Sequence, residues 1–421
     1  MLTVALEAVV DMSLTVGAVT QTVEVAGEAP AIETTNATIS GLVNEEQIRD
    51  LPVNGRNYVD LALLSPGVLY DRTTGNDPTT GYGQRLSVNG SRTDANLYLL
   101  DGANVNGPAN DAASVSGLTL GVEGIREFRL LTHNYDAEYG HGAGAVVSAV
   151  TRSGTNQLHG SVYEFVRNNV FDARDFFNVG DLPAFRRNQF GAAVGGPIKK
   201  DSIFYFANYE GLRQRQGNPV IVSVPDVNAR QGLVPDPTTG ALQQVPLNPA
   251  IVPYLKLYPV PNGRNFGDGT AQFIENFSAP TTEDYAMERM DFRPSDKDSF
   301  FWRHVDDPSN RLRTPVTTPT FVISDEATNH FVSLSESRIF SGAALNNFFF
   351  AFDRASRGAG TSAAPGITVD PSLAFIPGHQ IRTISFSVTN NSGQQLAELG
   401  TSRNNPTVFT QNSLKRAIPL A

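Results

Sequence analysis

The sequence contains no cysteine, which excludes a disulfide framework, a thiolate metal centre and thiol redox chemistry. It also has no long apolar run. The densest apolar cluster, Phe348 to Phe352, is five residues long, whereas a spanning helix needs ~20. No lysine or arginine precedes Arg49, so the basic start of a signal peptide is missing. Either the protein is not exported, or its biological start differs from the printed one.

Motifs for catalysis, cofactors and metals are missing too. The run from Gly191 to Lys199 has Pro197 where a phosphate-binding loop needs lysine. The six histidines are scattered, without the spacing of a zinc site. No Gly-x-Ser-x-Gly motif occurs. We therefore expect no catalytic residue, no cofactor, no metal site and no enzyme activity.

Composition favours β structure with many turns. The 421 residues include 37 glycines, and 18% of the residues are charged. Basic residues number 32 against 42 acidic ones, for a net charge of −10. Nucleic-acid binding requires a basic face, so this balance argues against a nucleic-acid partner.

The first third of the chain has the pattern of a compact α+β unit. Residues 12–25 are typical of a strand, and a proline-marked linker follows them. Residues 43–64 favour short helices that Pro52 interrupts and Pro66-Gly67 ends. Short strands are predicted at 85–89, 97–100, 125–132 and 145–151, separated by turns such as Asn89-Gly90 and Asp101-Gly102.

From residue 156 onward, apolar and polar side chains alternate in longer segments. The segments are 160–167, 187–195, 202–212, 285–293, 299–305, 329–339 and 345–354. In the last of them Phe348, Phe350 and Phe352 share one face, and Asp353 lies on the other. A soluble sandwich buries its apolar face, whereas a membrane barrel turns it toward lipid. Alternation alone leaves both architectures open, and the sandwich is commoner.

Residues 213–281 hold ten of the 26 prolines of the chain. Proline cannot donate a ladder hydrogen bond, so this stretch is predicted to be a long loop. It would be an extracellular loop of a barrel or a lid on a soluble protein.

Several stretches resemble one family. They are LPVNGRNYVDLALLSPGV (51–68), LSVNGSRTDANLYLLDGANVN (86–106), EGIREFRLLTHNYDAEYGHGAGAVVSAVTRSGTNQLHGSVYEFVRN (123–168), FDARDFF (171–177), FRRNQFGAAVGGPIKKDSIFYFANYEGLR (185–213) and RMDFRPSDKDSFFWRHVDD (289–307). In this order they resemble TonB-dependent outer-membrane receptors, specifically the Oar-like branch. The resemblance implies a mostly β fold: a small α+β plug domain followed by an antiparallel transmembrane β-barrel, which has 22 strands in the family. It also implies TonB and outer-membrane lipid as partners, an unknown extracellular ligand, and a location in the outer membrane of a Gram-negative-type bacterium.

On this resemblance the chain divides into three parts. Residues 1–28 resemble the end of a carboxypeptidase-regulatory-like β-sandwich plus a TonB-box-like segment. Residues 29–155 correspond to the plug domain, and 156–421 to part of the barrel, with the proline-rich extracellular loop at about 213–281. The strands are too few for 22, so the chain is expected to be a fragment that does not transport on its own.

The stretch DAEYGHGAGAVVSAVTRSGTNQLHGSVYEF (136–165) spans the expected boundary between plug and barrel. Gly142 to Ala145 are small, which predicts a plug strand approached closely by backbone and by the barrel wall. Tyr163 and Phe165 then begin the barrel and are expected to face lipid or its interface.

Two sets of residues are candidates for function under this resemblance. Thr22, Val23, Glu24 and Val25 are similar to the family's TonB-contact segment, which binds by strand addition; the alternative is the end of a sandwich strand. Asn89, Arg92, Asp101 and Asn104 lie in turns and are candidates for a ligand-facing plug apex. A surface-exposed or secreted β-rich adhesion protein without transport is the competing function.

Overall fold

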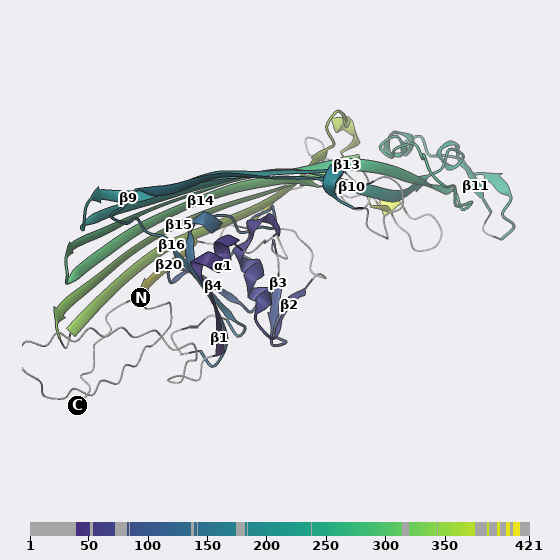
Figure 1. Ribbon diagram of the computed structural model, residues 1–421. Helices are drawn as coiled ribbons and strands as arrows, with labels where there is room; N and C mark the ends of the chain where they lie inside the picture. Colours follow the sequence, from purple (N-terminus) through teal and green to yellow (C-terminus); the bar gives the residue numbers. More distant parts are fainter. Residues whose placement is uncertain are drawn as a thin grey trace, which may run out of the picture.

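The computed structural model describes residues 39–50, 54–71, 82–83, 85–135, 139–140, 142–173, 182, 184–236, 238–313, 320–342, 344–374, 385–386, 394–395, 401–404 and 407–412 (Figure 1). Residues 1–28, including the expected sandwich end and TonB-contact segment, lie outside these ranges. Two bodies are seen: a small N-terminal unit, here called the plug unit (described residues within 39–155), and a large curved sheet, here called the wall. No helix within the described ranges is both long enough and apolar enough to cross a membrane.

The plug unit is built on a five-stranded mixed sheet in the order β1-β6-β7-β4-β5. Strands β1–β6 and β6–β7 pair antiparallel, and β4–β7 pair parallel. The strands are β1 (Ile39–Val43), β4 (Leu97–Leu100), β5 (Ala103–Asn104), β6 (Ile125–His133) and β7 (Val146–Thr151). A separate hairpin joins β2 (Val68–Asp71) and β3 (Arg85–Val88), and the helical pieces are α1 (Glu45–Asp50) and 3-10 turns at Asn54–Arg56, Tyr58–Leu64 and Val122–Gly124. These elements agree with the short helices and strands predicted for this part.

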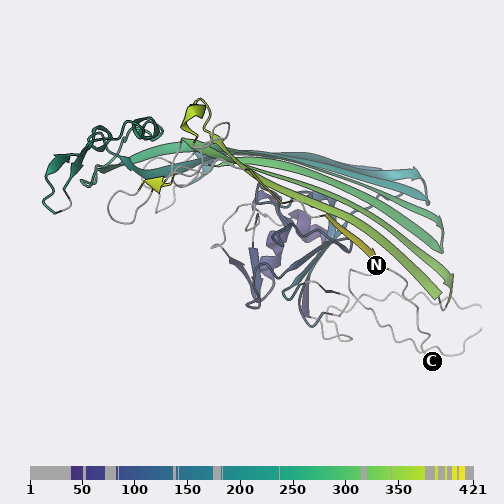
Figure 2. The same ribbon diagram turned by 180° about the vertical axis from the view of Figure 1, so that it is seen from behind.

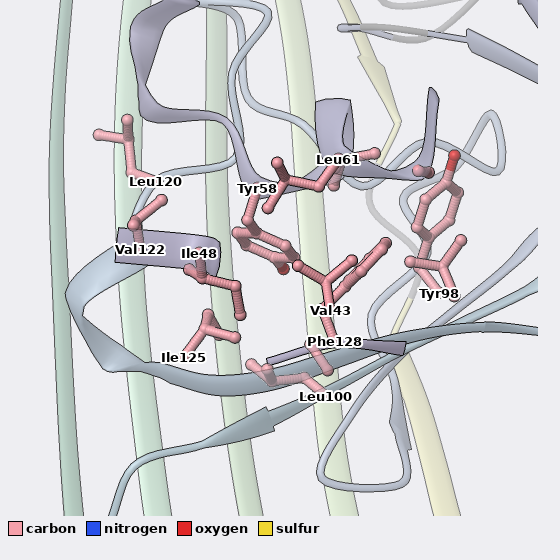
Figure 3. Packing of buried hydrophobic residues seen from close by; sticks show 14 of the residues in the cluster. Val43, Ile48, Tyr58, Leu61, Tyr98, Leu100, Leu120, Val122, Ile125 and Phe128 are labelled. Atoms are coloured by element: carbon pink, nitrogen blue, oxygen red, sulfur yellow. The ribbon is translucent and has the colours of Figure 1, made fainter. Parts of the chain in front are cut away.

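The plug unit has a continuous apolar core (Figure 3). Tyr58 meets Phe128 edge to face, with ring centroids 5.9 Å apart. Asn57 begins the 3-10 segment, because its side chain accepts a hydrogen bond from the Val59 amide. The cap directs Tyr58 and Leu61 onto the sheet, where Phe128 of β6 belongs to the same apolar cluster.

Two glycines before β7 are required by a close approach, as expected. A Cβ on Gly144 would lie 2.6 Å from the Asn96 Oδ1 atom, and one on Gly142 would lie 2.4 Å from the Ala95 carbonyl oxygen. The neighbouring backbone therefore belongs to the plug unit itself, and not to the wall.

The wall is one antiparallel sheet in the order β19-β16-β15-β14-β13-β10-β9-β8, with β20 also paired to β16. Its strands are β8 (His159–Asn168), β9 (Phe185–Lys199), β10 (Ile203–Pro225), β13 (Thr270–Ser295), β14 (Asp298–Arg313), β15 (Phe321–Ser341), β16 (Ala344–Ala363), β19 (Thr401–Asn404) and β20 (Thr407–Asn412). A further short pair joins β17 (Ser385–Phe386) and β18 (Gln394–Gln395). All seven alternating segments are strands, in the predicted order and longer than predicted.

The two faces of the wall differ in the way that a membrane barrel requires. The plug unit lies against the concave face, and no second sheet covers the convex face in the described part of the chain (Figures 1 and 2). Met290 and Phe292 are exposed on the convex face at 41% and 43%, while Asp291 between them is buried on the concave one. Asp353 is buried likewise. Because the face packed on the plug unit carries buried charged groups while large apolar side chains are exposed on the uncovered face, the sandwich alternative is wrong.

The orientation expected for Tyr163 and Phe165 is wrong. Tyr163 pairs with Gly191 and Phe165 with Gln189, which is buried on the concave side. Both rings cover the Arg56 guanidinium of the plug unit, at 4.3 and 4.5 Å from its central carbon. The outward residues of β8 are instead those such as Val162, which is 87% exposed. A shift of one residue reverses the two faces of a strand, and alternation alone did not specify which face was which.

The long loop is shorter than predicted. Strands β10 and β13 pair continuously from Arg213 with Thr282 to Pro225 with Thr270, so the connection is only 226–269. Beyond Gln216 strand β10 has no further pairing with β9, and β13 begins its pairing with β14 at Thr281. Pro219 and Pro280 therefore occupy stretches with one partner strand, where the missing N–H is tolerated.

The connection itself is folded. It contains β11 (Leu233–Pro235), β12 (Leu242–Gln244) and α2 (Val252–Leu255). The Arg230 guanidinium donates hydrogen bonds to the carbonyl oxygens of Pro225, Leu255, Tyr258 and Pro259. This single side chain therefore joins the end of β10 to the far part of the connection.

Candidate functional site

The site of interest is the interface between the plug unit and the wall, because alternate wall residues turn polar side chains onto the plug unit. Three arginines lie at its centre: Arg56 from the plug unit, and Arg303 and Arg357 from strands β14 and β16. Buried polar residues facing the interface include Gln189, Glu210, Glu283, Asp291, Arg303, Asp307, Asn329, Ser333 and Arg357. Burying charges is costly unless they are paired, so the pairs determine how the two bodies fit together.

The first cluster surrounds Asp101 in the tight β4–β5 turn, where Asp101 and Gly102 both have positive φ (48° and 84°). The Asp101 carboxylate lies 2.6 Å from Arg303 Nη1 and 3.5 Å from Arg289 Nη1. The Thr151 amide and hydroxyl donate to the same carboxylate at 2.9 and 2.7 Å. The turn therefore holds a plug carboxylate between two arginines of the wall.

The electrostatics of this cluster favour a charged Asp101. Burial of the carboxyl raises its pKa, but the attraction of Arg303 and Arg289 and the hydrogen bonds from Thr151 together lower the pKa below its ordinary value. Arg303 is fully buried, and its second terminal nitrogen donates to Ser333 at 2.8 Å. Asp101 is therefore an ionised anchor.

The second cluster surrounds Arg56, which follows Gly55 in a turn where both residues have positive φ. Its guanidinium donates to Glu123 at 2.7 Å and lies 3.8 Å from Glu210 of β10. Together with the two aromatic rings of β8 described above, this arrangement gives Arg56 both an ionic and a cation–π contact with the wall. Gln189 donates to Glu210 at 2.6 Å and to the Gly55 carbonyl at 3.1 Å.

The third cluster lies farther toward the long-connection end. Arg357 of β16 donates to Asn329 at 2.7 Å and to the Ala113 carbonyl at 3.2 Å, and lies 3.7 Å from Asp111. Asn329 donates in turn to Asp307 at 2.8 Å. Nearby, the Ser114 hydroxyl of the plug unit donates to Glu283 of β13. Plug residues 111–114 are therefore attached to strands β13 to β16.

A small cavity lies between the two bodies. It is bordered by Tyr58, Leu120, Tyr285 and Phe331 and has a volume of about 30 Å³, which leaves room for only about one or two water molecules. A larger hollow of about 370 Å³ lies on the plug unit at Asn89, Ser91 and Asn134. No group of three His, Asp or Glu residues within the described ranges is arranged to hold a metal ion. The three charged clusters and the small cavity show that this side of the plug unit is packed directly on the wall.

The four candidates for a ligand-facing plug apex differ in exposure. Asp101 is not exposed, since its side chain is only 5% accessible and is bound by wall arginines, and this burial does not fit the predicted ligand-facing position. Asn104 is half-buried and accepts from the Asn106 amide. Arg92, with a side chain 85% exposed and an ion pair to Asp94 at 3.2 Å, and Asn89, which borders the larger hollow, remain predictions.

Of the charged residues at the centre of the three clusters, the sequence pointed only to Asp101, and in a different role. Arg56, Arg303 and Arg357 carry no recognisable motif. The sequence did contain one signal of the inward face. Arginine and carboxylate side chains alternate with apolar or aromatic ones, as at Arg289 and Asp291, so they lie together on the opposite face of the strand.

Comparisons with known proteins match both bodies. Residues 31–147 match the TonB-dependent Receptor Plug Domain, and residues 150–416 match an Outer membrane beta barrel domain. A curated relative, the TonB-dependent transporter Oar of Myxococcus xanthus, is 31% identical over 48% of this chain and 19% of its own length. A second, a probable TonB-dependent siderophore receptor PirA of Acinetobacter baumannii, is 30% identical over 40% of this chain and 22% of its own length.

Solved structures agree on the fold. The outer membrane transporter YddB from Escherichia coli superimposes with a TM-score of 0.57 at 14% identity, covering 88% of this chain and 44% of that one. The siderophore receptor PirA from Acinetobacter baumannii gives 0.50 at 16% identity, covering 89% and 45%. The chain therefore spans about a fifth of the length of the curated relatives and less than half of these two structures.

Proposed function

Because the chain belongs to the TonB-dependent receptors of the outer membrane, we propose that it supplies the plug and part of the barrel wall of a receptor that binds an extracellular ligand and imports it with energy supplied through TonB. The closed, ion-paired interface between the plug unit and the wall supports this proposal most directly. A plug held by three buried arginine clusters blocks passage along the wall. Ligand movement then requires these clusters to open or rearrange.

The contact with TonB is proposed for Thr22, Val23, Glu24 and Val25. This segment precedes β1, which forms an edge of the plug sheet and begins at Ile39. Tension applied before β1 would act on that edge strand first. A peptide of residues 18–30 should bind the C-terminal domain of TonB, and the Val23→Pro peptide should not, because proline interrupts strand addition. Equal binding of both peptides would remove the assignment.

The ligand is proposed to meet the plug unit at Asn89 and Arg92. One relative is named a siderophore receptor, so a ferric siderophore is the first probe. The match to Oar supports assignment to the Oar-like branch, with residues 1–28 as the end of a carboxypeptidase-regulatory-like domain.

A reversible cross-link tests transport directly. The Val115 amide of the plug unit lies 3.4 Å from Ser309 Oγ of the wall, and the chain has no native cysteine. In the intact receptor, a disulfide between Val115→Cys and Ser309→Cys should abolish import, preserve ligand binding at the surface, and allow import again after reduction. The two single variants are the controls. Undiminished import with the disulfide formed would contradict a moving plug.

A further inference from the structure

An acid–base pair lies on the convex face of the wall, away from the plug unit. Glu288 of β13 and His304 of β14 are directly paired across the ladder, with the carboxylate 2.9 Å from the imidazole Nδ1. Their side chains are 49% and 36% exposed. The Trp302 ring stacks beside His304, at 6.3 Å between centroids and 9° between planes.

The pair lies at the depth of hydrocarbon. Glu288 is seven residues before the end of β13 at Ser295, and His304 is six after the start of β14 at Asp298. A strand tilted by about 40° climbs about 2.5 Å per residue, so both lie about 15–18 Å above the short turn. The apolar band of an outer-membrane barrel is about 25 Å tall.

An ion pair on the same face marks the upper edge of that band. Arg213, ten residues beyond Ile203, binds Asp284 at 2.8 Å, and the two lie about 25–28 Å above their turns. Between the pair and this edge, Asp306 Oδ1 lies 2.7 Å from His330 Nδ1 on the same face. The pair of Glu288 and His304 is therefore the lower end of a polar strip on this face, whose next row contains Asp306 and His330.

The flanks at this depth are apolar. The ladder row that contains Glu288 and His304 continues through Val332 to Phe352 on one side, and through Ala207 to Val194 on the other. Polar groups on the lipid face of a barrel are destabilising, and ionisable groups at membrane depth usually have a protein partner. Another acid, Glu336, lies on the same face beside Phe300. At the depth of the pair the polar surface is thus limited to β13 and β14, and in the next row Asp306, His330 and Arg354 extend it to β16.

We propose that this face of β13 and β14 is the contact between two copies of the protein in the membrane. Under a two-fold axis along the membrane normal, a residue meets only residues at its own depth. Glu288 and His304 lie side by side at nearly equal depth and have complementary chemistry. Each carboxylate therefore faces the imidazole of the second copy, and the exposed Met290 and the ring of Trp302 pack around the pair.

Single-cysteine cross-linking of the intact receptor in outer membranes tests the contact. Met290→Cys, next to the pair on the outward face, should form a dimer with a short bis-maleimide, and mass spectrometry should find only this chain in the band. Val194→Cys, also outward and 41% exposed but on β9, should give no dimer. Absence of the Met290 dimer, or a cross-link to a different protein, would overturn the proposal.

Two variants of the pair separate the contact from folding. In the Met290→Cys background, Glu288→Leu with His304→Leu should lose the dimer, while the barrel still shows heat-modifiable migration on a gel. The exchange of Glu288→His with His304→Glu preserves the complementarity and should keep the dimer. A dimer that persists in the leucine variant, or disappears in a folded exchange variant, would count against the reciprocal pair.

Discussion

Replacing Asp101 by asparagine should loosen the plug unit from the wall more than any change on the plug surface. The carboxylate binds Arg303 at 2.6 Å and Arg289 at 3.5 Å. Arg289 retains its ion pair with Asp291 at 2.8 Å. The substitution therefore acts mainly on Arg303, which is buried and forms its ion pair with Asp101 alone in the described ranges. Removing one member of a buried pair costs about 3–5 kcal/mol. We take about 3 kcal/mol because asparagine can still accept from the Thr151 amide.

This loss corresponds to about a hundredfold increase in the population of the opened plug. Hydrogen exchange of the β7 amides in the intact receptor measures it, because β7 contains the Thr151 amide that donates to Asp101. The matched control is Asp94→Asn, whose carboxylate is 42% exposed and pairs with the exposed Arg92; such pairs contribute at most about 1 kcal/mol. If β7 exchanges equally fast in both variants, the Asp101 cluster is not an anchor.

The same cluster predicts a pH dependence. Since the pKa of Asp101 is lowered in the folded protein, its contribution is complete above the unfolded value of about 3.9 and is lost as the pH falls through the folded pKa. The difference in β7 exchange protection between the parent protein and Asp101→Asn should therefore be the same at pH 7 and pH 5, because the intrinsic rate and all other groups are common to both proteins. Removing both charges, with Asp101→Leu and Arg303→Met, should recover part of the stability because no uncompensated arginine remains.

Three further substitutions, one of them with its own control, test other contacts. Arg56→Lys keeps the charge but loses the planar stacking, and should raise protease cleavage of the plug unit by an amount corresponding to about 1–2 kcal/mol. Gly144→Ala introduces a Cβ 2.6 Å from Asn96 Oδ1 and should destabilise the plug unit by about 1–3 kcal/mol in the same assay, whereas Gly140→Ala, with no atom within 4 Å, should have no effect. Arg230→Met leaves four carbonyl oxygens without their donor, so cleavage within 226–269 should accelerate while exchange in β7 stays unchanged.

The order of strands in the wall followed from a local signal. Alternation has a period of two residues, and it persists through each strand, so 285–293 and 345–354 could be located before their partners were known. The ends of the strands were harder to predict from the sequence. Pro219 and Pro280 argue locally against a ladder, but each has a partner strand on one side only, which depends on where the neighbouring strands end.

Composition and periodicity were sufficient to establish the kind of molecule: a β-rich chain with a compact α+β unit first and long amphipathic strands after it. They left open which face of each strand looked inward, because both faces of β8 offer plausible side chains and a shift of one residue exchanges them. That choice was made by contacts between distant residues. Tyr163 and Phe165 lie on the inner face, where their rings contact Arg56. The Asp101 turn is buried because its carboxylate forms an ion pair with Arg303. The role of a charged side chain depends on the residue that pairs with it. Arg303 is 202 positions from Asp101 in the sequence, so the residues around Asp101 do not indicate this partner.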